Sequence, residues 1–262
     1  MPNDAPPAGG PQPLSPVVAH FDGVADAYDQ VLPFFAAFAT QALRHLDTPP
    51  GTRALDLAAG RGAFTSQLLH RGCDVTAVDG SPRMIEHLRR DHPGLDARVM
   101  DATRLDLPDD TYDLIVCGFA IHIITDPYAA LAEALRVALR VARPGATLAF
   151  TVPAAGVSDP LTDLYAHYRQ YQPDGSGRHG NDLDLTRTRL AGLTETPLEV
   201  SLPVPDGETY WRWSRSHGSG RFIDGLPAAK RTEMHDRLLQ RLAGRTDFAL
   251  RRSATLWTAR KP

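Results

Sequence analysis

The sequence predicts an α/β fold, built on a doubly wound and mainly parallel sheet of seven strands. Short apolar segments alternate with helical patterns between residues 54 and 152. Strands separated by helices imply right-handed crossovers between parallel neighbours. A turn that contains Gly60 and Gly62 follows the first of these strands, where open α/β sheets bind their ligands.

Length and charge limit the classes of protein that fit. The chain has 262 residues, 28 basic and 31 acidic, with a net charge of −3, so we expect one catalytic core and no nucleic-acid partner. No apolar run approaches the ~20 residues that cross a bilayer, and no secretory signal pattern is present, which predicts a cytoplasmic protein without a membrane partner. Cys73 and Cys117 lie in apolar segments, so we expect them to be buried and predict no metal site.

The first 153 residues divide into a tail and a core. Residues 1–16 are rich in proline and predict a disordered tail. Residues 17–153 predict leading helices followed by the core. Strands are expected at 54–58, 74–78, 97–100, 112–117 and 146–152, with helices at 63–70, 81–90 and 127–141. Ser81 and Asp126 precede prolines and predict helix N-caps, and Pro144-Gly145 predicts a turn before the fifth strand.

The rest of the chain predicts a cap and a return to the core. Residues 154–225 carry many Gly, Pro, Asp and Ser and show no alternation of strands and helices, which indicates a substrate cap inserted after strand five. Residues 226–262 predict a C-terminal helix at 227–242 and two closing strands at 248–250 and 254–258, separated by a polar turn at 251–253.

The turn after the first strand is Ala54-Leu-Asp-Leu-Ala-Ala-Gly60-Arg-Gly62. Glycines there allow backbone N–H groups to approach a ligand, although a purely structural turn also requires glycine. A dinucleotide fingerprint would have a third glycine where Thr65 stands, and the carboxylate of Asp56 disfavours pyrophosphate. A cationic ligand fits this turn better.

These segments together resemble class I S-adenosylmethionine-dependent methyltransferases, in the small-molecule branch of ubiquinone/menaquinone-type and natural-product enzymes. The resemblance covers about residues 20–152 and implies a Rossmann-like sheet and S-adenosylmethionine as cofactor. Ala58 departs from the pattern, because the family usually has glycine there. The cofactor-binding residues that the resemblance implies are Asp56, Ala58, Gly60, Gly62, Asp79, Gly80, Met84, Asp101, Ala102 and Phe119.

In this resemblance Asp79 holds the ribose hydroxyls, Met84 packs on the adenine face, and Asp101 receives the adenine amino group. Each has a simpler reading: Asp79 could cap a helix, Met84 could be a core residue, and Asp101 could be a solvated loop residue.

Candidate catalytic residues are His122, after strand four, and His217, in the cap. An imidazole with an ordinary pKa of ~6.5 can deprotonate a phenol or an enol, although His122 could equally be a packed structural histidine. Four aromatic residues are predicted to contact substrate or to cover the cofactor: Phe21, Tyr28, Tyr210 and Trp213. Core packing is the alternative for each of them.

The sequence therefore predicts methyl transfer to oxygen, or to an acidic carbon, of a small aromatic or polyketide-like metabolite. Two alternatives stay open: an S-adenosylmethionine-binding enzyme that catalyses cyclisation or rearrangement, and a non-catalytic binding partner. A nicotinamide dehydrogenase is disfavoured by the glycine spacing. The chain is expected to be a monomer or a homodimer.

Overall fold

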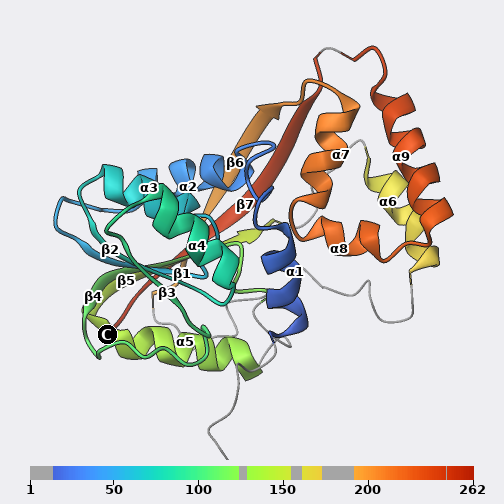
Figure 1. Ribbon diagram of the computed structural model, residues 1–262. Coiled ribbons are helices and arrows are strands. Elements are labelled where there is room, and N and C mark those ends of the chain that lie inside the picture. The colour runs from blue at the N-terminus through green and yellow to red at the C-terminus, as the bar shows by residue number, and fades with distance from the viewer. Residues whose placement is uncertain (1–13, 124–128, 155–160, 173–191, 246) are drawn as a thin grey trace, which may run out of the picture.

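The computed structural model describes residues 14–123, 129–154, 161–172, 192–245 and 247–262. Its centre is a seven-stranded sheet in the order β3-β2-β1-β4-β5-β7-β6 (Figure 1). The strands are β1 (Arg53–Leu57), β2 (Asp74–Asp79), β3 (Asp96–Val99), β4 (Tyr112–Gly118), β5 (Ala142–Pro153), β6 (Thr194–Pro203) and β7 (Ala249–Arg260).

The first five strands are parallel, and β7 lies antiparallel to both of its neighbours, β5 and β6. Parallel strands bring their carboxyl ends to one edge of the sheet. At this edge β1, β2 and β4 end beside one another. The predicted α/β fold class is confirmed.

Helices cover both faces of the sheet. The helical segments are α1 (Pro16–Val24), α2 (Phe34–Ala42), η1 (Leu43–His45), α3 (Ala63–His70), α4 (Pro82–Asp91), α5 (Ala129–Val141), α6 (Thr162–Tyr168), η2 (Arg169–Tyr171), α7 (Gly207–Arg215), α8 (Ser219–Asp224) and α9 (Ala228–Leu242). Figure 1 shows α2, α3 and α4 on one face and α5 on the other. Within the described residues, every helix is too short or too polar to cross a bilayer.

Buried apolar side chains fill the space on each face. One cluster joins the sheet to α2 and α3 and continues to α7 and α9 through side chains such as Phe38 and Trp213. A second cluster lies beneath α5 and includes Phe150. Both cysteines are buried, as predicted.

The C-terminal part of the sheet differs from the prediction. The two closing strands expected at 248–250 and 254–258 are one strand, β7, and residues 251–253 lie within it rather than in a turn. Its outer partner, β6, comes from the region predicted as a strandless cap, and pairs with β7 from Thr194 to Pro203. Pro197 and Pro203 suggested a loop, but an edge strand tolerates proline because one of its sides has no ladder to complete.

Two smaller expectations also change. The turn predicted at Pro144-Gly145 is an irregularity inside β5, where Gly145 has a φ of +79° and the pairing with β4 shifts. The expected tail ends earlier than predicted, because Ser15 caps α1 by accepting a hydrogen bond from the backbone N–H of Val18 at 3.3 Å. Residues 1–13 lie outside the described residues.

Ser81 is the N-cap of α4, as predicted, and its hydroxyl accepts a hydrogen bond from the Met84 N–H. The cap expected at Asp126 lies outside the described residues.

Candidate functional site

The turn after β1 is strained and tight. Ala58, Gly60 and Gly62 have φ values of +57°, +55° and +87°, in the left-handed region that glycine adopts easily and alanine does not. A Cβ on Gly60 would lie 3.3 Å from Cε1 of Tyr28, so this aromatic ring packs directly on the turn. The left-handed backbone at Ala58 explains why the family that the sequence resembles usually has glycine at this position.

The buried side chain of Asp56 stabilises this turn. Its side chain is 1% exposed, and one carboxylate oxygen accepts hydrogen bonds from the Thr65 N–H at 2.9 Å and the Thr65 hydroxyl at 2.7 Å. Burial raises the pKa of Asp56 to about 7. The expectation that Asp56 faces a ligand is therefore not met, because its carboxylate turns inward to the first turn of α3.

Asp79 joins the ends of β1 and β2. Its carboxylate accepts hydrogen bonds from the backbone N–H groups of Gly60 and Ser81, both at 2.8 Å. Burial raises its pKa, although these two hydrogen bonds favour the charged form. Unlike Asp56, Asp79 lines a cavity.

This cavity, here called the strand-end cavity, has a volume of about 440 Å³. Asp56 and Gly62 do not line it, but every other predicted cofactor residue does. Those lining residues are Ala58, Gly60, Asp79, Gly80, Met84, Asp101, Ala102 and Phe119. The turns after β1, β2, β3 and β4 therefore meet around one space.

The chemistry of the strand-end cavity fits S-adenosylmethionine. Met84, Val99 and Ala102 give apolar surface for a flat ring, while Asp79 and Asp101 offer carboxylate oxygens to ribose hydroxyls and an amino group. Asp101 is oriented by the N–H and hydroxyl of Thr103, at 2.8 and 2.7 Å.

Helix α1, the first of the predicted leading helices, forms a wall of this cavity. Leu14, Ser15, Val17 and Val18 line it together with Phe21, and of these five only Phe21 was predicted as a site residue. The Ser15-Pro16 pair is an N-cap signal that marks where the helix begins.

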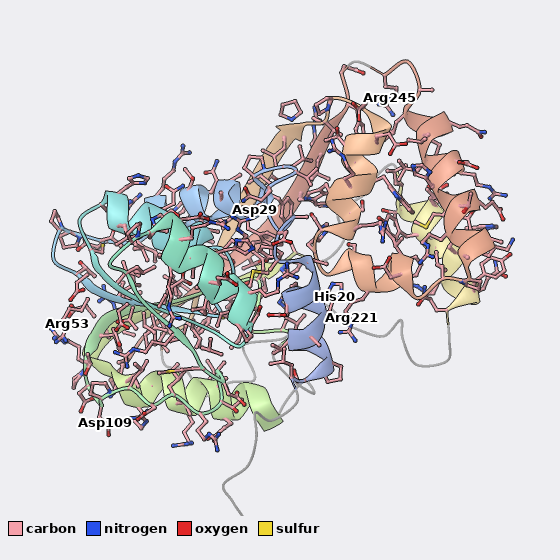
Figure 2. All side chains as sticks on the ribbon, in the orientation of Figure 1. His20, Asp29, Arg53, Asp109, Arg221 and Arg245 are labelled. Atoms are coloured by element: carbon pink, nitrogen blue, oxygen red, sulfur yellow. The ribbon has the colours of Figure 1, made fainter. Side chains whose placement is uncertain are left out.

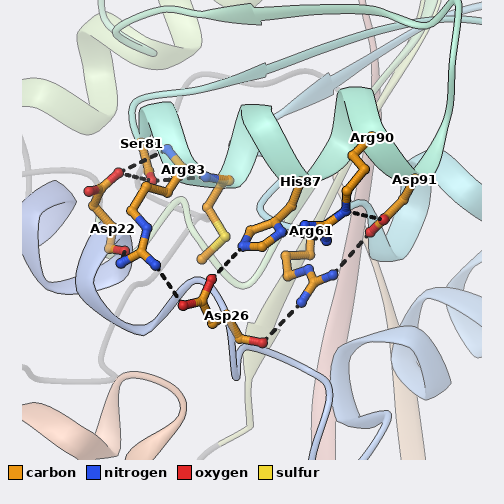
Figure 3. Close-up of polar contacts among 9 residues, drawn as sticks. Asp22, Asp26, Arg61, Ser81, Arg83, His87, Arg90 and Asp91 are labelled. Atoms are coloured by element: carbon orange, nitrogen blue, oxygen red, sulfur yellow. Dashed lines mark hydrogen bonds and ion pairs between the residues drawn. The ribbon is translucent and has the colours of Figure 1, made fainter.

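Charged side chains hold α1 and the loop after it against α4 (Figure 3). Asp22 accepts hydrogen bonds from the Ser81 hydroxyl at 2.6 Å and the Arg83 N–H at 3.0 Å. Asp26 pairs with Arg83 at 2.6 Å and with His87 at 2.9 Å. The hydrogen bond from His87 lowers the pKa of Asp26. This network fixes the wall of the strand-end cavity to the core.

A larger aromatic chamber, of about 720 Å³, adjoins the strand-end cavity. Phe21, Tyr28, Phe119 and Ile123 line both spaces. The remaining lining residues are Phe34, Phe35, His122, Pro153, Ala154, Thr162, Tyr165, Ala166, Arg169, Tyr210, Trp213, His217, Gly218, Ser219, Arg252 and Ser253. The structure thus brings both predicted catalytic histidines and all four predicted aromatic residues into one chamber.

The chamber walls come from segments far apart in the sequence. The Phe34 and Trp213 ring centroids are 5.3 Å apart, and the Tyr28 and Phe35 rings stack at 4.9 Å. Phe34 and Phe35 were not predicted as site residues, and their only sequence signal was the aromatic cluster at the start of α2. Asp29 positions this helix end by accepting hydrogen bonds from the N–H groups of Phe35 and Ala36, at 2.8 and 2.9 Å.

His217 is a neutral imidazole at pH 7. Its Nδ1 lies 2.6 Å from the carbonyl oxygen of Trp213 and must donate to it, which leaves Nε2 beside the Ser219 hydroxyl at 3.3 Å. Burial lowers the pKa of His217 to about 4, and the charge of Arg252 acts in the same direction. Such a group accepts hydrogen bonds but is a weak base.

Three further polar side chains lie in or beside the chamber: His122, Tyr28 and His20. His122 follows β4 and is half-buried. Burial raises the pKa of Tyr28 well above its usual range, so its hydroxyl stays protonated. His20 of α1, labelled in Figure 2 near Arg221, donates from Nε2 to the His217 carbonyl at 3.1 Å. Helix α1 and the loop after it therefore contact α4 on one side and the segment between α7 and α8 on the other.

Comparison with known proteins agrees with this geometry. Residues 55–150 match the methyltransferase domain family model. The chain is 34% identical over 160 residues to a demethylmenaquinone methyltransferase of Renibacterium salmoninarum, covering 58% of this chain but 65% of that protein, so it spans slightly less than two thirds of that relative. It is 31% identical over 214 residues, 80% of each chain, to a malonyl-[acyl-carrier protein] O-methyltransferase of Serratia marcescens.

The fold is also found in solved structures. A protein described as a methyltransferase from an antibiotic biosynthesis pathway of Anabaena variabilis superposes with a TM-score of 0.60, at 17% identity, over 84% of this chain and 95% of that one. At this identity the likeness concerns the fold alone. Sequence, fold and strand-end cavity agree: the chain belongs to the class I S-adenosylmethionine-dependent methyltransferases.

Proposed function

We propose that this protein transfers a methyl group from S-adenosylmethionine to an oxygen, or to an acidic carbon, of a small aromatic or polyketide-like metabolite. The observation that carries the proposal is the pair of adjoining cavities, which share Phe21, Tyr28, Phe119 and Ile123. One cavity has the lining expected for the cofactor, and the other is large and aromatic enough for the acceptor.

S-adenosylmethionine supplies a methyl group on a positively charged sulfur, so the residues of the chain chiefly align the acceptor and exclude water. In this proposal Asp79 and Asp101 hold the nucleoside, and Phe119 and Tyr28 form the boundary across which the acceptor faces the cofactor. Phe119 is fixed there because its N–H donates to the carbonyl and hydroxyl oxygens of Thr151, at 3.0 and 3.1 Å.

We assign the role of general base to His122, which lines the aromatic chamber beside this boundary. His217 is poorly suited to that role, because its pKa is about 4. It instead serves as a hydrogen-bond acceptor that positions the substrate. The relatives are named for action on demethylmenaquinone and on malonyl-[acyl-carrier protein], which supports a small organic acceptor for this chain. A cytoplasmic location and a monomeric or homodimeric state stay predictions.

Label transfer tests the proposal. The protein is incubated with S-adenosylmethionine carrying a labelled methyl group and a small-molecule extract of its host. We expect label to enter an extract component whose mass rises by one methyl group, and much slower transfer with the Asp79→Asn variant at limiting cofactor concentration. Label that stays in the cofactor, or an acceptor converted without a change in mass, would contradict methyl transfer.

A further inference from the structure

The charged side chains among the described residues that line the aromatic chamber are both basic. Arg252 of β7 and Arg169 of η2 line it, and no Asp or Glu is among its described lining residues. Apolar walls have a low dielectric constant, so they screen such charges weakly and concentrate their field inside the cavity. The chamber therefore favours an anionic ligand, although most of its surface is aromatic.

Arg252 is held in a defined orientation on the chamber wall. Its guanidinium donates to the Tyr210 hydroxyl at 3.4 Å and to the Arg251 carbonyl at 2.9 Å, and lies 5.8 Å from the Trp213 ring centre. Tyr210 and Trp213 are 0% and 4% exposed, so they form a rigid support. A planar guanidinium placed in this way matches a carboxylate, which it binds through two parallel hydrogen bonds.

His217 shows the effect of this positive field. Burial is the main reason for its low pKa, and the charges of Arg252 and His20 lower the pKa further. His217 is neutral at pH 7, so it does not compete with Arg252 for an anion. Its unprotonated Nε2 can instead accept a hydrogen bond from a hydroxyl group of the ligand.

The two arginines lie away from the cofactor. Arg252, Arg169 and Trp213 line only the aromatic chamber, whereas Phe21, Tyr28, Phe119 and Ile123 form its boundary with the strand-end cavity. A ligand bound at Arg252 through one end would present its other end to that boundary. An anionic anchor on the cap side would therefore orient the acceptor without taking part in methyl transfer.

We propose that the acceptor carries a carboxylate, or an oxyanion of similar shape, remote from the atom that is methylated, and that Arg252 binds this group. The proposal rests on the proposed function, since it treats the aromatic chamber as the acceptor site. Arg252 is a specificity-determining residue here, and Arg169, which is exposed on η2, adds attraction at the chamber wall.

Calorimetry with two matched probes tests this. In the presence of saturating S-adenosylhomocysteine, 2-naphthoate and the neutral 2-naphthamide are titrated into the protein. We expect naphthoate to bind at least about tenfold more tightly than the amide, as one charge-assisted contact allows. Arg252→Gln should remove this preference, and Arg252→Lys should keep part of it, because the charge remains while the planar fork is lost.

Arg251→Gln is the matched control, because Arg251 is the exposed neighbour on the same strand and does not line the chamber. It should keep the full preference for naphthoate. Equal binding of the two probes by the wild-type protein, no binding of naphthoate at millimolar concentration, or an equal loss in both glutamine variants would overturn the proposal. Titration with S-adenosylhomocysteine alone distinguishes failure of this proposal from failure of the proposed function. If the wild-type protein did not bind S-adenosylhomocysteine, the proposed function itself would be contradicted.

Discussion

The strand-end cavity and the aromatic chamber adjoin, but they are built in different ways. The strand-end cavity is formed mainly by short turns that follow neighbouring strands, and its polar groups are carboxylates such as Asp79 and Asp101. The aromatic chamber is formed largely by α2, α6, η2, α7 and β7, and the charged side chains among its described lining residues are arginines. The first suits a cationic nucleoside cofactor, and the second suits an aromatic acid. In the proposed function, cofactor and acceptor are therefore selected mainly by different residues, although Phe21, Tyr28, Phe119 and Ile123 line both spaces.

The largest expected effect is a loss of catalytic rate that leaves cofactor binding intact. His122→Asn should lower kcat by about 100-fold or more, the usual contribution of a general base, and leave S-adenosylhomocysteine affinity unchanged, because His122 lines only the aromatic chamber. His217→Asn should cost much less, since a group with a pKa of about 4 is a weak base. The two variants are compared by steady-state kinetics with the identified acceptor.

The pH dependence sharpens this test. The acidic limb of the kcat/KM profile should persist in His217→Asn and disappear in His122→Asn. If His217→Asn abolished turnover while His122→Asn kept it, the assigned roles would have to be exchanged.

The next effect concerns the cofactor side. Asp79→Asn removes the charge that accepts hydrogen bonds from Gly60 and Ser81 and that would meet the ribose. We expect S-adenosylhomocysteine to bind about 30- to 100-fold more weakly in calorimetry, a loss of ~2–3 kcal/mol. Asp74→Asn, at the exposed start of the same strand, should bind normally. Affinities within twofold of each other for Asp79→Asn and the wild type would exclude Asp79 as a ligand of the cofactor.

A smaller effect tests Asp56 as a structural residue. Burial raises its pKa to about 7, above the ~4 of an unfolded chain, so the folded protein binds the proton more tightly. The contribution of Asp56 to the free energy of unfolding should therefore fall as the pH rises from about 4 to 7, whereas His217, whose pKa burial lowers, contributes with the opposite sign. Asp29, whose pKa burial raises to about 6, acts with the same sign as Asp56 over the lower part of that window.

Asp56→Asn keeps an acceptor for Thr65 and removes the titrating group. Between about pH 6 and 7, where Asp29 contributes little, we expect the wild type to lose on the order of 1 kcal/mol relative to the variant, because the contributions of Asp79 and His217 are common to both proteins. Urea unfolding measured across that range checks this. An unchanged decline in the variant would show that Asp56 is not the group responsible.

The smallest effect concerns the strained turn. Ala58→Gly should stabilise the protein by up to about 1 kcal/mol, because relief of the left-handed conformation outweighs the added freedom of the unfolded chain. Ala59→Gly is the control, since Ala59 has no positive φ and should be destabilised by about 1 kcal/mol. Urea unfolding of both variants decides the matter; equal destabilisation would mean that Ala58 stores no strain.

The contrast between the two regions also explains what the sequence could predict. Gly60, Asp79 and Asp101 follow strands whose order is visible in the chain, and parallel strands necessarily bring such turns to one edge. Local spacing therefore sufficed for most of the strand-end cavity. It did not show that Asp56 turns inward, because which side of a turn a carboxylate faces depends on Thr65 in the next helix.

The aromatic chamber was harder to predict because its parts are distant in sequence. Phe34 meets Trp213 and His217 only after the chain has folded, and no periodicity links these positions. Strand β6 was missed because Pro197 and Pro203 are typical of loops. Without β6, the polar residues 251–253 suggested a turn, although they lie inside the first half of β7 and pair with β6.

A crystal structure with S-adenosylhomocysteine bound tests the central claim most directly. We expect the ribose beside Asp79, the adenine between Met84 and Ala102, and the sulfur facing the boundary formed by Phe119 and Tyr28. The aromatic chamber should remain open to an acceptor. A nucleoside bound inside the aromatic chamber, among Trp213 and His217, would contradict the assignment of the two cavities.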